Sequence, residues 1–339
     1  MSSVSSDPPD PQGAGAAPRP PLPPPPTAGR PPATPPPPAR QDGASEATVA
    51  GNGAIAESGG DAPQEVGEPG WAWWQALLGF AAALLGTVLL GAVVVGTLAL
   101  ATGTSLRAQT PTLVILGVVI QDFVFVGVAL AFAAITARPR GWHFGLRRVP
   151  LWPTLGWAAL GVCAYLLFNV AYEALVEPRA EQGVAEALGV NDSAALLVIG
   201  GFVVIVMAPI AEEFFFRGFF YRALRNSLVQ PLGRWRGAIL GAVLTGLIFG
   251  FIHIEPDNVA KTLPIIPVLA ALGVMFCLVY ERTGSLFVVI ALHALINATA
   301  YLTVAKDSWP VALGFGGGMI AACLLVPRLL SRGPAPAAA

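Results

Sequence analysis

The sequence predicts an all-α protein, a polytopic membrane bundle of about eight transmembrane helices that follows a disordered, Pro-rich N-terminal tail. Three observations predict this fold class. Hydrophobic residues make up 55% of the 339 residues, and charged residues make up only 12%, which is about half the charged fraction of a soluble domain. The apolar residues also fall in long runs with few charges, and such runs are typical of membrane spans.

Residues 1–69 differ in composition from the rest of the chain. This segment contains 18 of the 32 prolines, including the run at 23–26, and it has no aromatic residue. It cannot bury enough apolar surface to offset the entropy lost on ordering. We therefore expect a disordered cytosolic tail with local polyproline II structure, which serves as a solvated spacer or, alternatively, as a dock for a proline-binding partner.

After the tail, eight apolar runs are long enough to cross a bilayer. Because helices satisfy their own backbone hydrogen bonds in lipid, we expect a transmembrane bundle over residues 70–332. In a bacterium, such a multi-pass protein would lie in the plasma membrane. The predicted spans are residues 73–102, 112–136, 151–176, 195–220, 237–254, 263–280, 284–304 and 309–330.

Basic residues are distributed unequally between the two sides of this bundle. Twelve Lys and Arg residues lie at the ends of spans two, four, six and eight or in the loops after them, whereas the opposite loops hold four. Since cytosolic loops carry the excess of positive charge, both termini are expected in the cytosol. The net charge is only -1, so the chain has no overall basic field and nucleic acid is not an expected partner.

The fourth predicted span carries ionisable residues where lipid is expected. Glu212, Glu213 and Arg217 lie within six residues of one another, and each ionisable group at mid-bilayer costs about 2.5–3.5 kcal/mol on insertion scales. Glu213 and Arg217 are four residues apart, so they share a helix face and can neutralise each other. Glu212 points about 100° away and has no partner in its own helix.

Two of the three histidines also lie in predicted spans. His253 is near the end of the fifth, and His293 shares a helix face with Asn297 in the seventh. With Glu212, these groups are the components of a water-activating site, since a carboxylate or imidazole can accept a proton and an amide or second imidazole can stabilise an oxyanion. Glu212, His253 and His293 would equally supply the three protein ligands of a catalytic zinc ion.

Structural roles for the same residues stay open at this point. An intramembrane histidine can serve as an interhelical hydrogen-bond partner, and Glu213 with Arg217 can be a structural ion pair. The fifth span also contains two GxxxG spacings, Gly237 with Gly241 and Gly246 with Gly250. These spacings let helices approach closely, so we interpret the four glycines as packing residues.

Three motifs occur in order, each within a predicted span: Glu212-Glu213-x-x-x-Arg217, Phe249-x-x-x-His253 and His293-x-x-x-Asn297. This pattern resembles the CAAX-protease and bacteriocin-processing (CPBP) family of intramembrane endopeptidases, often called Abi proteins. The loop segment 142–146 is similar to a short segment of that family, and its His143 is expected at the membrane interface. The resemblance covers about residues 146–300, the expected protease core.

The resemblance implies roles for the first motif and its partner. It implies that Glu212 activates water and that His253 assists it. It further implies that Glu213 and Arg217 position that carboxylate and its helix.

The resemblance also bears on the oxyanion, the metal and the substrate. His293 and Asn297 match groups proposed to stabilise the tetrahedral oxyanion. Family members are commonly labelled metalloproteases, although a metal-free glutamate mechanism is also argued, so Zn2+ or another divalent ion and a metal-free site both remain open. The implied substrate is a peptide or protein, either lipid-modified at a CAAX-type C-terminus or carrying a leader peptide.

Two non-catalytic functions compete with an intramembrane endopeptidase. A transporter should show interrupted spans in corresponding halves of the chain, but Pro209, Pro264 and Pro267 form no such repeat. A pseudo-protease that binds substrate, or a membrane scaffold, would tolerate loss of Glu212 while still requiring the packing glycines.

Overall fold

The computed structural model describes residues 69–103, 105, 110–176, 183–255 and 259–330. The predicted disordered tail lies outside these residues except for its last one. The secondary structure of the described part is helical, and eight of its helices are long and apolar enough to cross a membrane. The protein is therefore an all-α, multi-pass integral membrane protein, as the sequence predicts.

The observed helices follow the predicted spans closely. Three short helices connect them: η1 (Gly141–Phe144), α4 (Val184–Ala187) and α9 (Val259–Thr262). The spanning helices are α1 (Trp73–Thr102), α2 (Pro111–Thr136), α3 (Leu151–Val176), a composite helix (Ala194–Leu232), α8 (Arg234–Phe251), α10 (Ile266–Thr283), which η5 (Leu263–Ile265) precedes, α11 (Leu286–Val304) and α12 (Trp309–Leu330).

The composite helix differs most from its prediction, because it continues twelve residues beyond the predicted end at residue 220. Arg217, which was counted with the basic residues of the expected cytosolic side, is a buried helix residue. The helix ends at Gly233, whose φ of 80° suits glycine. Its five successive parts are α5 (Ala194–Phe202), the π-helical η2 (Val203–Met207), α6 (Ala208–Glu213), the π-helical η3 (Phe214–Tyr221) and α7 (Arg222–Leu232).

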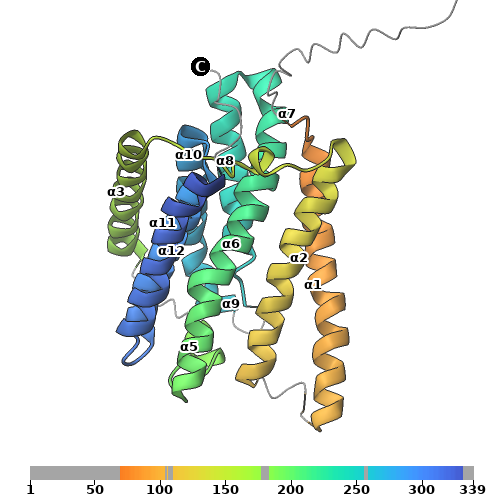
Figure 1. Ribbon diagram of the computed structural model, residues 1–339, viewed down its shortest axis with the longest axis vertical. Helices are drawn as coiled ribbons and strands as arrows, with labels where there is room; N and C mark the ends of the chain where they lie inside the picture. Colours follow the sequence, from red (N-terminus) through yellow and green to blue (C-terminus); the bar gives the residue numbers. More distant parts are fainter. Residues whose placement is uncertain (1–68, 104, 106–109, 177–182, 256–258, 331–339) are drawn as a thin grey trace, which may run out of the picture. The chain divides into compact units, whose positions relative to one another are not determined.

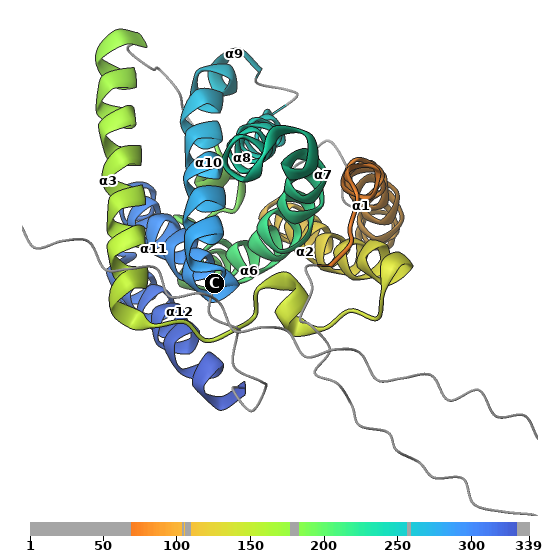
Figure 2. The same cartoon turned by 90° about the horizontal axis from the view of Figure 1, so that it is seen from above.

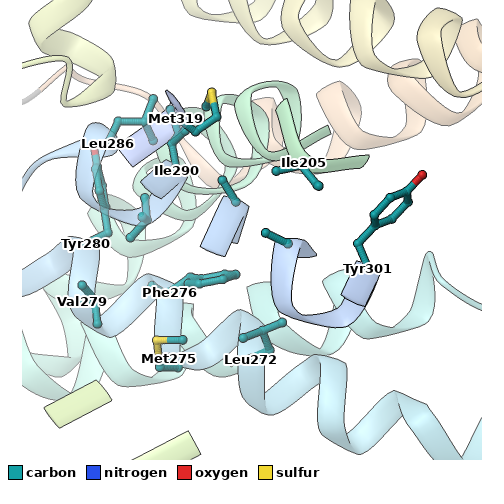
Figure 3. Packing of buried hydrophobic residues seen from close by; sticks show 14 of the residues in the cluster. Ile205, Leu272, Met275, Phe276, Val279, Tyr280, Leu286, Ile290, Tyr301 and Met319 are labelled. Carbon is teal, nitrogen blue, oxygen red and sulfur yellow. The ribbon is translucent and has the colours of Figure 1, made fainter. Parts of the chain in front are cut away.

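α6 occupies the middle of the helical bundle. It lies between α2 on one side and α11 on the other, with α8 and α10 behind it (Figure 1 and Figure 2). Aromatic side chains of α1 and α2 pack on η3, where they form one apolar cluster. A second cluster joins η2, α10 and α11 through residues such as Ile205, Phe276 and Ile290 (Figure 3). Ionisable groups on α6 are thus surrounded by packed protein.

The GxxxG glycines of α8 allow close packing, as predicted. A Cβ atom at Gly246 would lie 2.5 Å from the carbonyl oxygen of Ala270 on α10, and one at Gly250 would lie 2.9 Å from that of Ile266. Gly237 similarly faces the backbone of α7. The contact between α8 and α10 therefore depends on the absence of side chains at these positions.

α3 lies at the edge of the bundle, where it packs mainly against α10 (Figure 2). Near its start, Trp157 lies 4.3 Å from the guanidinium of Arg282, which Trp235 of α8 approaches to 4.2 Å. Near its end, the hydroxyl of Tyr172 donates a 2.7 Å hydrogen bond to the carbonyl of Pro264. A cation–π contact and a hydrogen bond thus fix the two ends of an otherwise peripheral helix.

The loop around η1, which contains His143, is buried against the bundle. His143 is 7% exposed, and its Nδ1 accepts a hydrogen bond from the backbone N–H of Arg140. Tyr280 of α10 donates to the carbonyl of Phe144, 3.0 Å away. Burial, together with the positive charges of Arg140 and Arg222, lowers the pKa of His143.

Candidate active site

The paired glutamates of the first motif lie on α6, between the two π-helical stretches. π-Helical turns inside α-helices are frequent at functional sites. Both Glu212 and Glu213 are buried. Their negative charges must therefore be balanced by neighbouring groups.

Glu213 and Arg217 form the ion pair that their spacing predicts. Nη1 of Arg217 donates a 2.8 Å hydrogen bond to Oε1 of Glu213, and both side chains are 0% exposed. Nη2 donates to the carbonyl of Gly273 on α10 at 3.2 Å. The guanidinium carbon also lies 4.5 Å from the ring centre of Phe249 and 5.0 Å from that of Phe276. These contacts offset the cost of burying the pair and tie the composite helix to α8 and α10.

His293 joins this network from α11. Its Nδ1 lies 2.8 Å from Oε1 of Glu213, and Nδ1 is the donor because a carboxylate can only accept. Its Nε2 lies 3.9 Å from Oε2 of Glu212. Glu213 therefore orients the imidazole so that its second nitrogen approaches Glu212. Oε2 of Glu212 is buried and has no hydrogen-bond partner within the described residues.

Asn297 lies one turn beyond His293, and its amide contacts the backbone of η2. Nδ2 donates a 2.8 Å hydrogen bond to the carbonyl of Val204. In η2 the N–H of Ala208 binds a carbonyl five residues earlier, and the next bond in that series would run from residue 209 to Val204. Pro209 has no N–H to make it. Asn297 thus satisfies the carbonyl that the proline leaves free, and its donor group is committed to the helix.

Among the described residues, His253 forms no hydrogen bond or ion pair with either glutamate of the first motif. α8 ends at Phe251, three residues before the predicted end, and His253 lies in the turn that follows. Its Nδ1 is 2.7 Å from the carbonyl oxygen of Phe249, so Nδ1 donates and Nε2 is free to accept. The Phe249 ring lies 4.9 Å from the ring of His253 and 6.1 Å from that of His293, measured between centroids. Phe249 is therefore the group that connects the two imidazoles.

Comparison with known proteins assigns the segment that carries these residues. Residues 194–299 match the family model described as Rce1-like, a type II CAAX prenyl endopeptidase. The chain carries an Rce1-like domain. The matched segment includes every residue of the three motifs, from Glu212 to Asn297, in agreement with the resemblance to CPBP endopeptidases. No curated protein and no solved structure matches the chain.

The Rce1-like domain does not assemble a metal-ligand set from the predicted donors. Within the described residues, no group of three His, Cys, Asp or Glu side chains is placed to hold a metal ion. His293 directs one nitrogen to Glu213 and the other to Glu212, while Nδ1 of His253 contacts the carbonyl oxygen of Phe249. The donor set Glu212, His253 and His293 therefore does not fit a metal ion in this arrangement.

Asp122 is a further carboxyl group near the site of the Rce1-like domain, and it belongs to none of the three motifs. It lies in the middle of α2, which packs against α6, and it is 3% exposed. Its carboxyl group interacts electrostatically with that of Glu212. The available signal was its position, because Asp122 is the one charged residue within the predicted span 112–136.

Proposed function

We propose that this protein is an intramembrane endopeptidase in which Glu212 activates the attacking water. The family match supports a membrane protease in general, and the proposal adds the residue roles and the substrate. As substrate we propose a peptide or protein with a prenylated, CAAX-type C-terminus, because the matching model describes prenyl endopeptidases of that type. The lipid group of such a substrate would partition into the bilayer that surrounds the domain.

One observation carries the assignment of the base. Glu212 presents a buried carboxylate oxygen without a hydrogen-bond partner in the described part of the chain, 3.9 Å from Nε2 of a histidine that a second glutamate orients. A purely structural carboxylate of this kind would be expected to be paired. An unsatisfied, oriented acceptor is instead suited to accept a proton from water.

In the proposed mechanism His293 acts as an imidazolium. With His293 as imidazolium, its positive charge and that of Arg217 balance the negative charges of Glu212 and Glu213. In a low-dielectric site, a balanced set is much more stable than one with an excess charge. Protonated Nε2 of His293 can then donate to the oxyanion that forms next to Glu212.

The reaction then proceeds in two steps. Glu212 accepts a proton from water while the water oxygen adds to the carbonyl carbon of the scissile peptide bond, which gives a tetrahedral oxyanion. Glu212 next returns the proton to the nitrogen, and the C–N bond breaks to release an amine and a carboxylic acid. Glu213 and Arg217 position the imidazole, Asn297 holds the backbone of η2, and His253 contributes a second acceptor next to Phe249.

We also propose that both termini lie in the cytosol. With Arg217 assigned to the interior, eleven basic residues remain on the expected cytosolic side against four on the other. Labelling of single cysteines in intact cells with a membrane-impermeant maleimide tests this orientation. A cysteine at Arg148 should be protected and one at Lys306 should be labelled, whereas the reverse pattern would invert the topology.

Cleavage of a fluorogenic farnesylated CAAX peptide by the purified protein in lipid vesicles tests the function. Glu212→Gln should lower kcat/KM by about 10²–10⁴-fold, the usual contribution of a general base, without changing thermal stability or helix content. An unprenylated leader-type peptide tests the alternative substrate, and a chelator with zinc add-back tests for a metal. If Glu212→Gln keeps wild-type turnover, Glu212 is not the base; if the wild type binds the peptide without cleaving it, the protein is a pseudo-protease.

A further inference from the structure

Asp122 of α2 is a buried carboxyl group whose oxygens have no hydrogen-bond donor. It is the one charged residue in α2, and its side chain is 3% exposed. Both Oδ1 and Oδ2 are buried without a hydrogen-bond partner among the described residues. An ionised carboxylate in such a place is strongly disfavoured unless a cation or several donors compensate it. Packing alone therefore does not explain why a carboxyl group is buried at Asp122.

The packing of aromatic rings fixes where Asp122 lies along the composite helix. Phe125 of α2 stacks on Phe215 at 4.9 Å between ring centroids, and Phe132 approaches Phe219 at 6.5 Å. Residue numbers rise together along the two helices, so they run parallel, as Figure 1 also shows. Asp122 lies three residues before Phe125, and Glu212 lies three residues before Phe215. This register brings the two carboxyl groups to the same level, and they interact electrostatically.

Two neighbouring buried carboxyl groups cannot both be ionised unless cations compensate both charges, because like charges repel in a medium of low dielectric. The cations near the site are already committed. Arg217 donates to Glu213 and to the Gly273 carbonyl, and His293 lies between Glu213 and Glu212. Glu212 has the nearby imidazole to stabilise its charge, whereas aromatic rings are the neighbours of α2 one turn beyond Asp122. The negative charge therefore belongs on Glu212 and the proton on Asp122.

We propose that Asp122 is a positioning residue for the reaction: in its neutral form it donates a hydrogen bond, directly or through the attacking water, that orients the ionised Glu212. The inference rests on the proposed function of Glu212, through which Asp122 acts. A neutral carboxyl group supplies both a donor and an acceptor. Within the described residues, Oδ1 and Oδ2 of Asp122 and Oε2 of Glu212 are three acceptors without donors. A proton on Asp122 satisfies two of these oxygens at once.

The test compares three variants of α2 in the farnesylated-peptide assay. Asp122→Asn keeps a neutral donor of similar shape, so its kcat should stay within about threefold of the wild type. Asp122→Leu has a similar branched shape, although it is larger, and it has no donor, so kcat should fall about 10²-fold, as for a misplaced catalytic group, with KM unchanged. Phe123→Leu, at a 67% exposed neighbouring position, is the matched control and should have no effect.

Two readouts separate positioning from a structural role. Asp122→Leu should unfold at a temperature equal to or above that of the wild type, since it removes unsatisfied buried oxygens; a lower unfolding temperature with unchanged kcat would indicate a structural role and overturn the inference. The infrared spectrum of the wild type should contain the C=O stretch of a protonated carboxyl group, and Asp122→Asn should lack it. If that band is unchanged in Asp122→Asn, Asp122 is ionised and the inference is wrong.

The outcomes also distinguish this inference from the function on which it rests. If Glu212→Gln is inactive while Asp122→Leu is fully active, Asp122 does not position Glu212, and the proposed base is unaffected. If Asp122→Asn is as poor as Asp122→Leu, the carboxylate itself is needed and the neutral form is excluded. If Glu212→Gln is fully active, the proposed function fails first, and the infrared band alone decides whether Asp122 is protonated.

Discussion

The side-chain amide of Asn297 supplies the hydrogen bond that Pro209 cannot make. The proline interrupts the π-helical series of η2, and the freed carbonyl of Val204 accepts from Asn297 at 2.8 Å. The two residues are 88 positions apart in the chain, on the composite helix and on α11. A break in one helix is thereby converted into a contact between two helices, next to the glutamates.

This relationship predicts that the two residues are energetically coupled. Asn297→Ala should lower the free energy of unfolding by about 1–2 kcal/mol, because it leaves the Val204 carbonyl unsatisfied. In a Pro209→Ala background the restored N–H can bond that carbonyl, so the same substitution should cost markedly less. A double-mutant cycle of thermal unfolding in detergent measures the difference. Equal costs in both backgrounds would mean that Pro209 does not create the need for Asn297.

A second prediction concerns the buried ion pair. Arg217→Met should destabilise the protein by about 3–5 kcal/mol, because Glu213 is left with a buried charge that only His293 can balance. Combining it with Glu213→Gln removes the stranded charge and should recover part of the loss. Arg217→Lys should not substitute for arginine, since the guanidinium contacts both Glu213 and the Gly273 carbonyl. Unfolding temperatures of the four proteins provide the comparison, and a double variant no better than Arg217→Met would contradict the argument.

A third prediction tests the close contact of α8 with α10. Gly246→Ala places a methyl group against the Ala270 carbonyl, so it should lower the free energy of unfolding by about 1–3 kcal/mol through overpacking. Gly117→Ala in α2 is the matched control, because a Cβ there meets nothing within 4 Å. The control should be neutral or slightly stabilising, since alanine favours helix over glycine. Similar stabilities for the two variants would show that the helices separate without cost.

A fourth prediction follows from His143, which lies outside the membrane-spanning helices. Its pKa is lower in the folded protein than its ordinary value of 6.5, so below about pH 6.5 the unfolded chain binds this proton more readily than the folded one. The stability that neutral His143 provides is complete above pH 6.5 and is lost as the pH falls toward the folded pKa. Thermal unfolding between pH 7.5 and pH 5 should show this decline, and His143→Gln should reduce it. An identical pH dependence in the variant would exclude His143 as its source.

The sequence was sufficient for the parts of the fold that composition and spacing determine. The eight spans followed from the length of the apolar runs, and the Glu213–Arg217 pair followed from the pitch of an α-helix. The end of the composite helix did not, because Arg222 and Arg225 suggested a loop although their side chains pack against Tyr280 and Glu281. Polar residues near a membrane surface are compatible with either state, and tertiary contacts decide between them.

The site was only partly predictable for a related reason. The spacing of His293 and Asn297 correctly places both on one face of α11, but their partners depend on the π-helical turns of the composite helix. Pro209 is the one local signal of those turns, and it does not specify a π-helix by itself. His253 was expected within its helix, whereas α8 ends two residues before it. Asp122 was visible as an isolated charge, but its neighbour Glu212 became evident only from the register of α2.

The π-helical turns on either side of α6 have a consequence for insertions and deletions. A π turn accommodates one surplus residue while the flanking α-helix keeps its orientation. Deleting a single residue within η2 could therefore be absorbed by a return to α geometry, with Glu212 still directed at His293. Deleting one residue within α6 would instead rotate the segments relative to each other by about 100° and separate these side chains. Tolerance to length change should thus alternate along this one helix, high in the wide turns and low between them.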